Sequence, residues 1–253
     1  MALAVAILWS LAAVGAGSAA LSAVGLRHAL PTEERPVWAF AIGLGVLGWI
    51  TFFLALAGLL TPVPLLALSL LCASGLALLR GSAMRWSWPH LGPAAWLGLG
   101  ALALVILFDA VEALVPPFNI DALAYHIALP KRFAEINGID TVARLRVGAP
   151  PGLLHMTYII PLVLGGEGAL KLCLALLGWA PGLLIYVLAR RYLSFPWALA
   201  ATLIFLTVPA VIFAGGTAQV EPTAALFVLA GAFAVAESLR TRSIGFKIGR
   251  AHV

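Results

Sequence analysis

Long apolar blocks, separated by short polar intervals, make up most of this chain. An α-helix rises about 1.5 Å per residue, so about 20 apolar residues cross the hydrocarbon core of a bilayer. The pattern therefore predicts an all-α, polytopic membrane helix bundle with about seven transmembrane helices. The blocks that approach the required length are Leu3–Leu26, Val37–Leu60, Val63–Leu79, Ala94–Val115, Ala169–Ala189, Trp197–Ala214 and Thr223–Leu239.

One long polar interval, Pro116–Pro151, interrupts this pattern. Its first part, Asn119–Leu129, predicts a helix at the membrane surface, because apolar residues recur at helical spacing on one face. Pro130 ends that helix, and Lys131–Ile136 predicts a second turn of helix that the following Asn-Gly pair closes. The predicted apolar face consists of Ile120, Leu123, Ala124 and Ile127.

A shorter apolar stretch, Gly152–Leu164, follows the polar interval directly and contains Pro161. It is too short to cross a bilayer, which takes about 20 residues. We therefore predict a third juxtamembrane helix here, lying at the interface or half inserted.

Composition supports the membrane assignment. The chain has 253 residues, of which 63% are hydrophobic and 10% are charged, and its mean hydropathy is +1.08. Soluble domains average about 25% charged residues. The excess of 15 Lys and Arg over 10 Asp and Glu does not indicate nucleic-acid binding. Most basic residues instead stand at the ends of apolar blocks, as the positive-inside rule describes.

Three short basic clusters fix the predicted orientation. If all three lie in the cytoplasm, Pro116–Pro151, the loop around Glu221 and the N-terminus lie outside. The outer loop itself breaks the rule with four basic residues, so either it binds an anion or the orientation is inverted; we adopt the first interpretation. The cytoplasmic clusters are Arg80 with Arg85, Arg190 with Arg191 and Arg240 with Arg242, and the outer basic residues are Lys131, Arg132, Arg144 and Arg146.

The last six residues, Ile248–Val253, match a translated sequencing-library adapter. We expect them to be an artefact and exclude them from the fold. Residues 1–247 would then be the N-terminal part of a larger membrane protein, and this part alone would be inactive.

Two acids stand beside predicted helices on the outer side. Asp121 and Tyr125 are neighbours at i and i+4 on one helix face, and Glu221 opens the last helix. Each has an ordinary structural interpretation: Asp121 and Glu221 suit helix N-termini, and His126 suits a side chain that reaches to the interface. Lys131 and Arg132 would by the same reasoning face lipid headgroups.

A second acidic pair, Asp109 and Glu112, lies near the outer end of the fourth block. An ionised group facing lipid there is costly. These side chains are therefore expected to face the bundle or a water-filled cavity, and they either line a donor site or are held by partners.

The order of several short motifs resembles the GT-C superfamily of integral-membrane glycosyltransferases, which includes protein O-mannosyltransferases and aminoarabinose transferases. The resemblance covers about residues 105–240. The motifs are Asp121-Ala-Leu-Ala-Tyr125-His126, Pro130-Lys131, Pro150-Pro151-Gly152, Gly165-Gly-Glu-Gly-Ala-Leu-Lys171, Tyr186 with Arg190-Arg191, and Thr207-Val-Pro-Ala followed by Glu221.

The resemblance implies transfer of a sugar from a polyprenyl-phosphate donor to a lipid, glycan or protein acceptor outside the cytoplasm, in a bacterial inner membrane. Asp121 resembles the essential acid of the first outer loop and would be the general base. Glu221 resembles the second acid, although the family often has Asp there, and it would orient the acceptor. If a divalent cation, Mg²⁺ or Mn²⁺, is used, Asp121 and Glu221 would hold it.

The donor phosphate needs cations at the membrane surface, which the four outer basic residues can supply. Tyr125 and His126 are further candidates for substrate binding. The alternative function is a transporter or lipid flippase without chemistry, which predicts charges in mid-helix and paired broken helices. A third reading, a non-catalytic scaffold, predicts that Asp121 and Glu221 can be replaced without loss.

Overall fold

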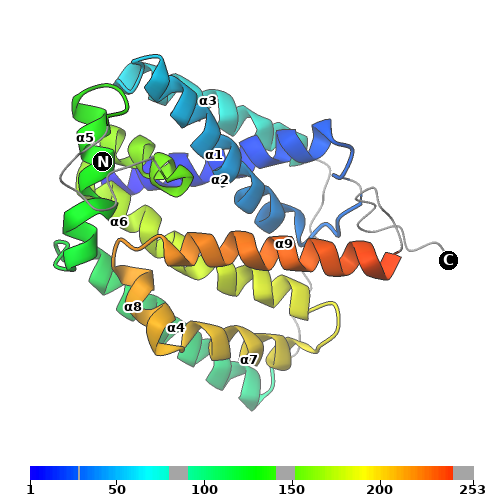
Figure 1. The fold of residues 1–253 in the computed structure, drawn as a ribbon. Coiled ribbons are helices and arrows are strands. Elements are labelled where there is room, and N and C mark those ends of the chain that lie inside the picture. The colour runs from blue at the N-terminus through cyan, green and yellow to red at the C-terminus, as the bar shows by residue number, and fades with distance from the viewer. Residues whose placement is uncertain (28, 80–90, 141–151, 242–253) are drawn as a thin grey trace.

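The computed structural model describes residues 1–27, 29–79, 91–140 and 152–241, and the ordered elements in these ranges are all helical (Figure 1). The predicted all-α class is therefore confirmed for the described part of the chain. In order, the elements are α1 (Ala2–Ala23), α2 (Arg35–Leu56), α3 (Pro62–Ser74), the 3₁₀ helix η1 (Gly75–Leu79), α4 (Pro93–Leu114), the π-helix η2 (Ala122–His126), α5 (Ala128–Glu135), α6 (Leu153–Ala189), α7 (Phe195–Leu206), α8 (Pro209–Gly216) and α9 (Glu221–Thr241).

Six described helices are long and apolar enough to cross a membrane, and the number is up to seven if α7 and α8 together form one span. The polytopic membrane character predicted from the apolar blocks is therefore confirmed. The block Trp197–Ala214, listed above as long enough to cross the membrane, is divided between α7 and α8. Its axis bends by 75° between α7 and α8, because Val208 precedes Pro209 and takes an extended conformation.

The predicted juxtamembrane segment Gly152–Leu164 corresponds to the first of two helical segments within α6. Helix α6 has 37 residues in all, and its second segment runs through the block that begins at Ala169. Pro161 lies inside the helix without ending it. The helix is broken instead at Gly166, where φ is 74° and ψ is −172°, a conformation that favours glycine.

The helices alternate in direction, so the loops collect at two ends of the bundle (Figure 1). One end, here called the η2 end, holds the N-terminus, η2 with α5, the start of α6 and the start of α9. The other, called the Arg191 end, holds the start of α2, the α6–α7 turn and the end of α9. The η2 end gathers the segments that the sequence analysis placed outside the membrane.

Close packing of α1, α2 and α6 forms the centre of the bundle. Small residues permit this, since a Cβ added at Gly17 would overlap the Ala39 backbone and one at Gly43 would overlap the Ala13 backbone. The indole of buried Trp9 in α1 donates to the Thr157 carbonyl in α6 at 3.2 Å. This packing holds the start of α6 in place at the η2 end.

Candidate functional site

Asp121 stands at the end of the loop between α4 and η2, and its carboxylate does not cap the helix. The Asn119 side-chain oxygen accepts from the backbone N–H groups of Asp121, at 2.8 Å, and Ala122. No side-chain capping bond is made by Asp121 itself. The capping role considered for Asp121 therefore belongs to Asn119, an ordinary use of asparagine before a helix.

The winding of η2 changes which side chains are buried. Its backbone bond from the Ile127 N–H to the Ala122 carbonyl is of the π type, which spans five residues where an α-helix spans four. Of the expected apolar face, Ile127 is buried, and Ile120, Leu123 and Ala124 are exposed together, as side chains that face lipid would be. Ile120 and Leu123 are 78% and 54% exposed, whereas His126 is buried. His126 is therefore not a side chain that reaches out to the interface.

His126 meets a residue that the sequence analysis did not single out, His155 in the first turn of α6. The two rings stack with 19° between their planes, and His126 Nδ1 lies 2.9 Å from His155 Nε2. The Gln219 side chain also lies close enough to His126 to bond its ring. His155 Nδ1 is buried and has no hydrogen-bond partner within the described residues. A buried polar atom left unpaired typically costs about 1–3 kcal/mol.

The two candidate acids, Asp121 and Glu221, both lie near Tyr125 and His126. Asp121 enters from the loop after α4, and Glu221 enters at the start of α9. The pKa of the Tyr125 hydroxyl is raised by burial and by the negative charges of Asp121 and Glu221, and its bond to Asp121 adds to the shift. Both charges also act on His126. The structure thus places Asp121, Tyr125, His126 and Glu221 in one site, together with His155.

Burial has the largest effect on the titration of His126. It lowers the pKa of the imidazole, because a charged ring is poorly solvated there, while the charges of Glu221 and Asp121 partly oppose the shift. The imidazole is therefore neutral near pH 7. Next to it, Tyr158 of α6 donates from its hydroxyl to the Gln219 carbonyl at 3.0 Å and closes the inner side of the site.

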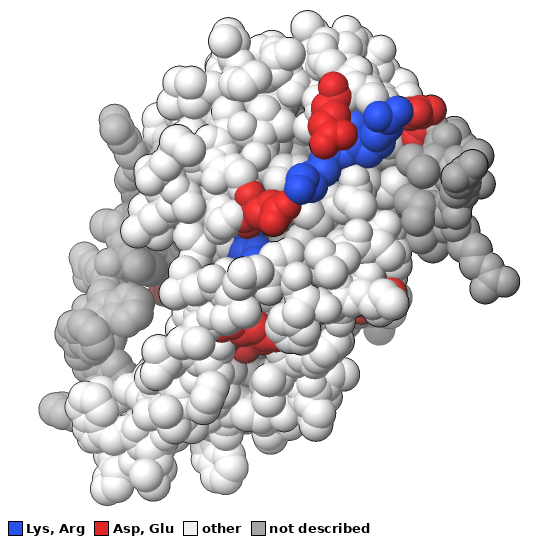
Figure 2. Space-filling view, turned by 90° about the vertical axis from the view of Figure 1, so that its left-hand side faces the viewer, with Lys and Arg blue, Asp and Glu red and all other residues white. Residues whose placement is uncertain are grey.

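The basic candidates on α5 are engaged elsewhere. Lys131 pairs with Glu167 at 2.5 Å, a contact that raises the pKa of the lysine, and Arg132 pairs with Asp140 at 3.4 Å. These side chains are about half exposed, and on the face seen in Figure 2 charged groups gather in a diagonal row of alternating sign. Within the described residues no ion pair joins them to Asp121 or Glu221. Arg144 and Arg146 lie outside the described residues.

Asp109 and Glu112 face the bundle, as expected. The Trp179 indole donates to the Asp109 carboxylate at 2.8 Å. A Cβ added at Gly216, at the end of α8, would overlap the Glu112 carboxylate, so the broken span approaches α4 closely here. Buried Lys171 donates to the backbone carbonyls of Glu112, at 2.8 Å, and Val115. It thereby caps α4, a role the sequence analysis did not foresee.

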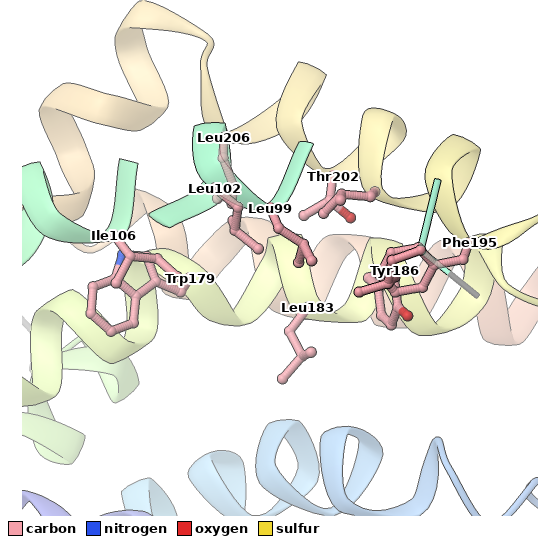
Figure 3. Close-up of a pocket in the computed structure, with 11 residues that line it drawn as sticks. Leu99, Leu102, Ile106, Trp179, Leu183, Tyr186, Phe195, Thr202 and Leu206 are labelled. Carbon is pink, nitrogen blue, oxygen red and sulfur yellow. The ribbon is translucent and has the colours of Figure 1, made fainter. Parts of the chain in front are cut away.

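Two apolar cavities lie between the helices of the bundle. One of about 380 Å³ opens between α4, α6 and α7, with Trp179 and Ile106 at one end and Tyr186 and Phe195 at the other (Figure 3). The second, of about 410 Å³, lies between α1, α4 and α6, and Trp179 also lines it. Their linings are almost wholly apolar, so they suit hydrocarbon rather than a sugar.

Among the described residues, no group of three or more His, Cys, Asp or Glu side chains is arranged to hold a metal ion. Asp121 and Glu221 are thus two carboxylates without a third such ligand in that part of the chain. Comparison with known proteins finds no matching family model, curated protein or solved structure.

Proposed function

We propose that this chain belongs to a membrane glycosyltransferase that moves a sugar from a polyprenyl-phosphate donor to an acceptor at the η2 end. One observation carries the proposal. Two carboxylates from loops about a hundred residues apart, Asp121 and Glu221, act on the same tyrosine and histidine at the end of a membrane bundle. Convergent acids beside titratable side chains are typical of active sites.

Asp121 suits the role of general base. Asn119 caps the helix in its place, so the carboxylate remains available to an acceptor hydroxyl. A general base contributes about 10²–10⁴-fold to a rate. Glu221 is exposed at the start of α9 and would orient the acceptor, while Tyr125 and His126 shape the inner wall.

The leaving group would be a polyprenyl phosphate, whose charge requires cations. Lys131 and Arg132 can supply them, because half-exposed ion pairs contribute only about 0–1 kcal/mol and exchange readily for a phosphate. Arg144 and Arg146 belong to the same loop and are proposed for the same role. A divalent cation held by Asp121 and Glu221 would neutralise phosphate charge as well.

The η2 end would face away from the cytoplasm. Arg190, Arg191 and Arg240 stand at the Arg191 end, which the positive-inside rule assigns to the cytoplasm. The basic residues near η2 would then be retained for the phosphate. We propose a bacterial inner membrane as the location and a lipid, glycan or protein as the acceptor.

The direct test is a transfer assay on the full-length chain encoded at its source locus, purified and reconstituted in liposomes. Undecaprenyl phosphate carrying tritium-labelled mannose, glucose or aminoarabinose is supplied with an extract of the source membranes as acceptor. The expected result is that label leaves the lipid-soluble donor and undecaprenyl phosphate is released. If none of these donors is consumed, the proposal is overturned.

A second candidate, a transporter or flippase, is favoured by the broken helices. The α7–α8 span is bent by 75°, α6 is broken at Gly166, and Asp109 is buried within the bundle. Discontinuous helices of this kind often bind transported substrates. The same liposomes distinguish the two functions, since a flippase moves the labelled donor to the other leaflet without cleaving it.

A further inference from the structure

Lys171 is a buried lysine to which the proposed transfer assigns no role. It stands in α6 after the break at Gly166 and is 4% exposed. Its side-chain nitrogen donates to the backbone carbonyl of Glu112 at 2.8 Å and to that of Val115. Helices usually end with a glycine, or with water on these last carbonyls. A lysine buried among apolar helices is costly, and it is therefore an uncommon way to end α4.

The Val115 carbonyl stands where the loop to the first candidate acid begins. From there the chain passes through Pro116 and Pro117 to Asn119. The two proline rings restrict the backbone of this short loop. Asn119 in turn accepts from the backbone N–H of Asp121 at 2.8 Å. A displacement of Val115 is therefore passed on to Asp121, because little of the loop between them can absorb it.

Lys171 also borders the place where the two acid-bearing loops meet. A cavity of about 10 Å³ is lined by Lys171, by Asn119 from one loop, and by Gly216 and Thr217 from the segment that leads to Glu221. This volume is roughly enough for one water molecule. The two loops thus lie against each other beside the lysine.

We propose, on the basis of the proposed sugar transfer, that Lys171 is a positioning residue that sets where Asp121 stands relative to Glu221. Its two hydrogen bonds fasten the start of the Asp121 loop to α6, against the segment that leads to Glu221. A misplacement of about 1 Å at a catalytic group can lower a rate by about 100-fold. Lys171 touches neither substrate nor reacting atoms, and it acts only through the position of Asp121.

The test is Lys171→Met in the full-length chain reconstituted in liposomes. Methionine is unbranched like lysine but has no donor for the two carbonyls. In the transfer assay the turnover number should fall by about 100-fold. KM for the labelled donor should hardly change, because the proposed phosphate-binding residues Lys131 and Arg132 stand on α5.

Hydrogen exchange followed by mass spectrometry reads the loop position without any transfer. In Lys171→Met the backbone amides of residues 116–127 should exchange faster than in wild type, because the start of the loop is no longer held. Peptides from the Arg191 end should exchange as in wild type, which shows that the bundle is folded.

Two further variants serve as controls. Lys171→Arg keeps donors for both carbonyls and should retain most of the wild-type turnover and loop exchange. Trp38→Phe removes a different buried side-chain donor, the indole that bonds Glu34 at 3.2 Å at the Arg191 end. Its turnover per folded molecule and the exchange of residues 116–127 should match wild type.

The outcomes separate the two proposals. If wild type transfers sugar and Lys171→Met either keeps the wild-type turnover or leaves the exchange of residues 116–127 unchanged, the positioning role is wrong and the glycosyltransferase proposal stands. An equal loss of turnover in Trp38→Phe also overturns that role, since any lost buried hydrogen bond would then have the same effect. If wild type consumes no donor, the proposed function fails, and the positioning role fails with it.

Discussion

The two ends of the bundle differ in how their carboxylates are held. At the Arg191 end, Glu34 and Glu237 are each 3% exposed, and both are bound by arginine. Glu34 accepts two bonds from Arg191, at 2.5 and 2.6 Å, and a third from Trp38. Arg240 makes two further bonds to Glu237. Each buried glutamate at this end is therefore paired with arginine through at least two hydrogen bonds, as in a structural contact.

At the η2 end the two candidate acids are not held in this way. In the described part of the chain no ion pair joins Asp121 or Glu221 to a basic residue. A carboxylate without an ion-pair partner remains available to a substrate. The comparison therefore assigns stability to the Arg191 end and chemistry to the η2 end, and each of the following variants tests that division.

The largest effect is expected for Asp121→Asn. It should lower sugar transfer by about 10²–10⁴-fold, because the amide cannot take a proton. Stability should change by less than about 1 kcal/mol, since Asn119 provides the helix cap. Turnover and the unfolding midpoint in mixed micelles measure the two quantities. Transfer at the wild-type rate would show that the carboxylate at the η2 end is not the base.

The next largest effect is expected for Glu34→Gln, which should lower stability and leave sugar transfer unchanged. Arg191 would lose its bidentate partner and keep only Glu237 at 3.7 Å, so the free energy of unfolding should fall by about 3 kcal/mol. Transfer per folded molecule should be unchanged. The double variant Glu34→Gln with Arg191→Met should recover much of the loss, because no buried charge is left without its partner. If Glu34→Gln instead lost turnover while its stability stayed at the wild-type value, the Arg191 end would not be purely structural.

A smaller effect is expected between the two ends for Gly43→Ala. The new methyl group would overlap the Ala13 backbone and force α1 and α2 apart, at a cost of about 1–3 kcal/mol. Gly100→Ala in α4 is the matched control, because an added Cβ there meets nothing within 4 Å. Unfolding curves for the two variants should differ by at least this cost. Equal stability would mean that α1 and α2 are less closely packed than described.

The smallest effect on stability is expected for Lys131→Gln. Its pair with Glu167 is about half exposed, so the loss should stay below about 1 kcal/mol. The pKa of Lys131 is raised, so the pair contributes fully below the ordinary lysine value and is lost only as pH rises above it. If the side chain binds the donor phosphate, KM for the donor should rise while stability hardly changes. Unchanged KM would remove Lys131 from the donor site.

The helix bundle was predictable from the sequence because each spanning helix is marked by many apolar residues in a row. Each apolar block carries enough residues to identify a helix, and a few substitutions would not hide it. The bend between α7 and α8 was also signalled, by Pro209 inside the last block but one. Pro161, noted inside the block Gly152–Leu164, does not end the helix, because a proline in a buried membrane helix is tolerated when neighbours pack around it.

The candidate site was predictable only in part. Asp121, Tyr125, His126 and Glu221 were proposed together, and the structure brings them together. The burial of His126 was not predicted, because a π-helix rotates side chains away from their α-helical positions. His155 was missed because its partner lies 29 residues away, although both stand in segments predicted to share the outer surface. Sequence patterns report local periodicity, and this contact is tertiary.

Gly166 gives the two ends a mechanical relation. Helix α6 carries His155 near its start and leads into Arg191 just after its end, so one element connects site and ion pairs. Gly166, at φ 74°, divides it into two rigid rods joined by a hinge. Trp9 of α1 holds the first part through the Thr157 carbonyl, and Glu34 holds the end of the second part through Arg191. The break at Gly166 therefore lets the position of His155 be set separately from that of Arg191.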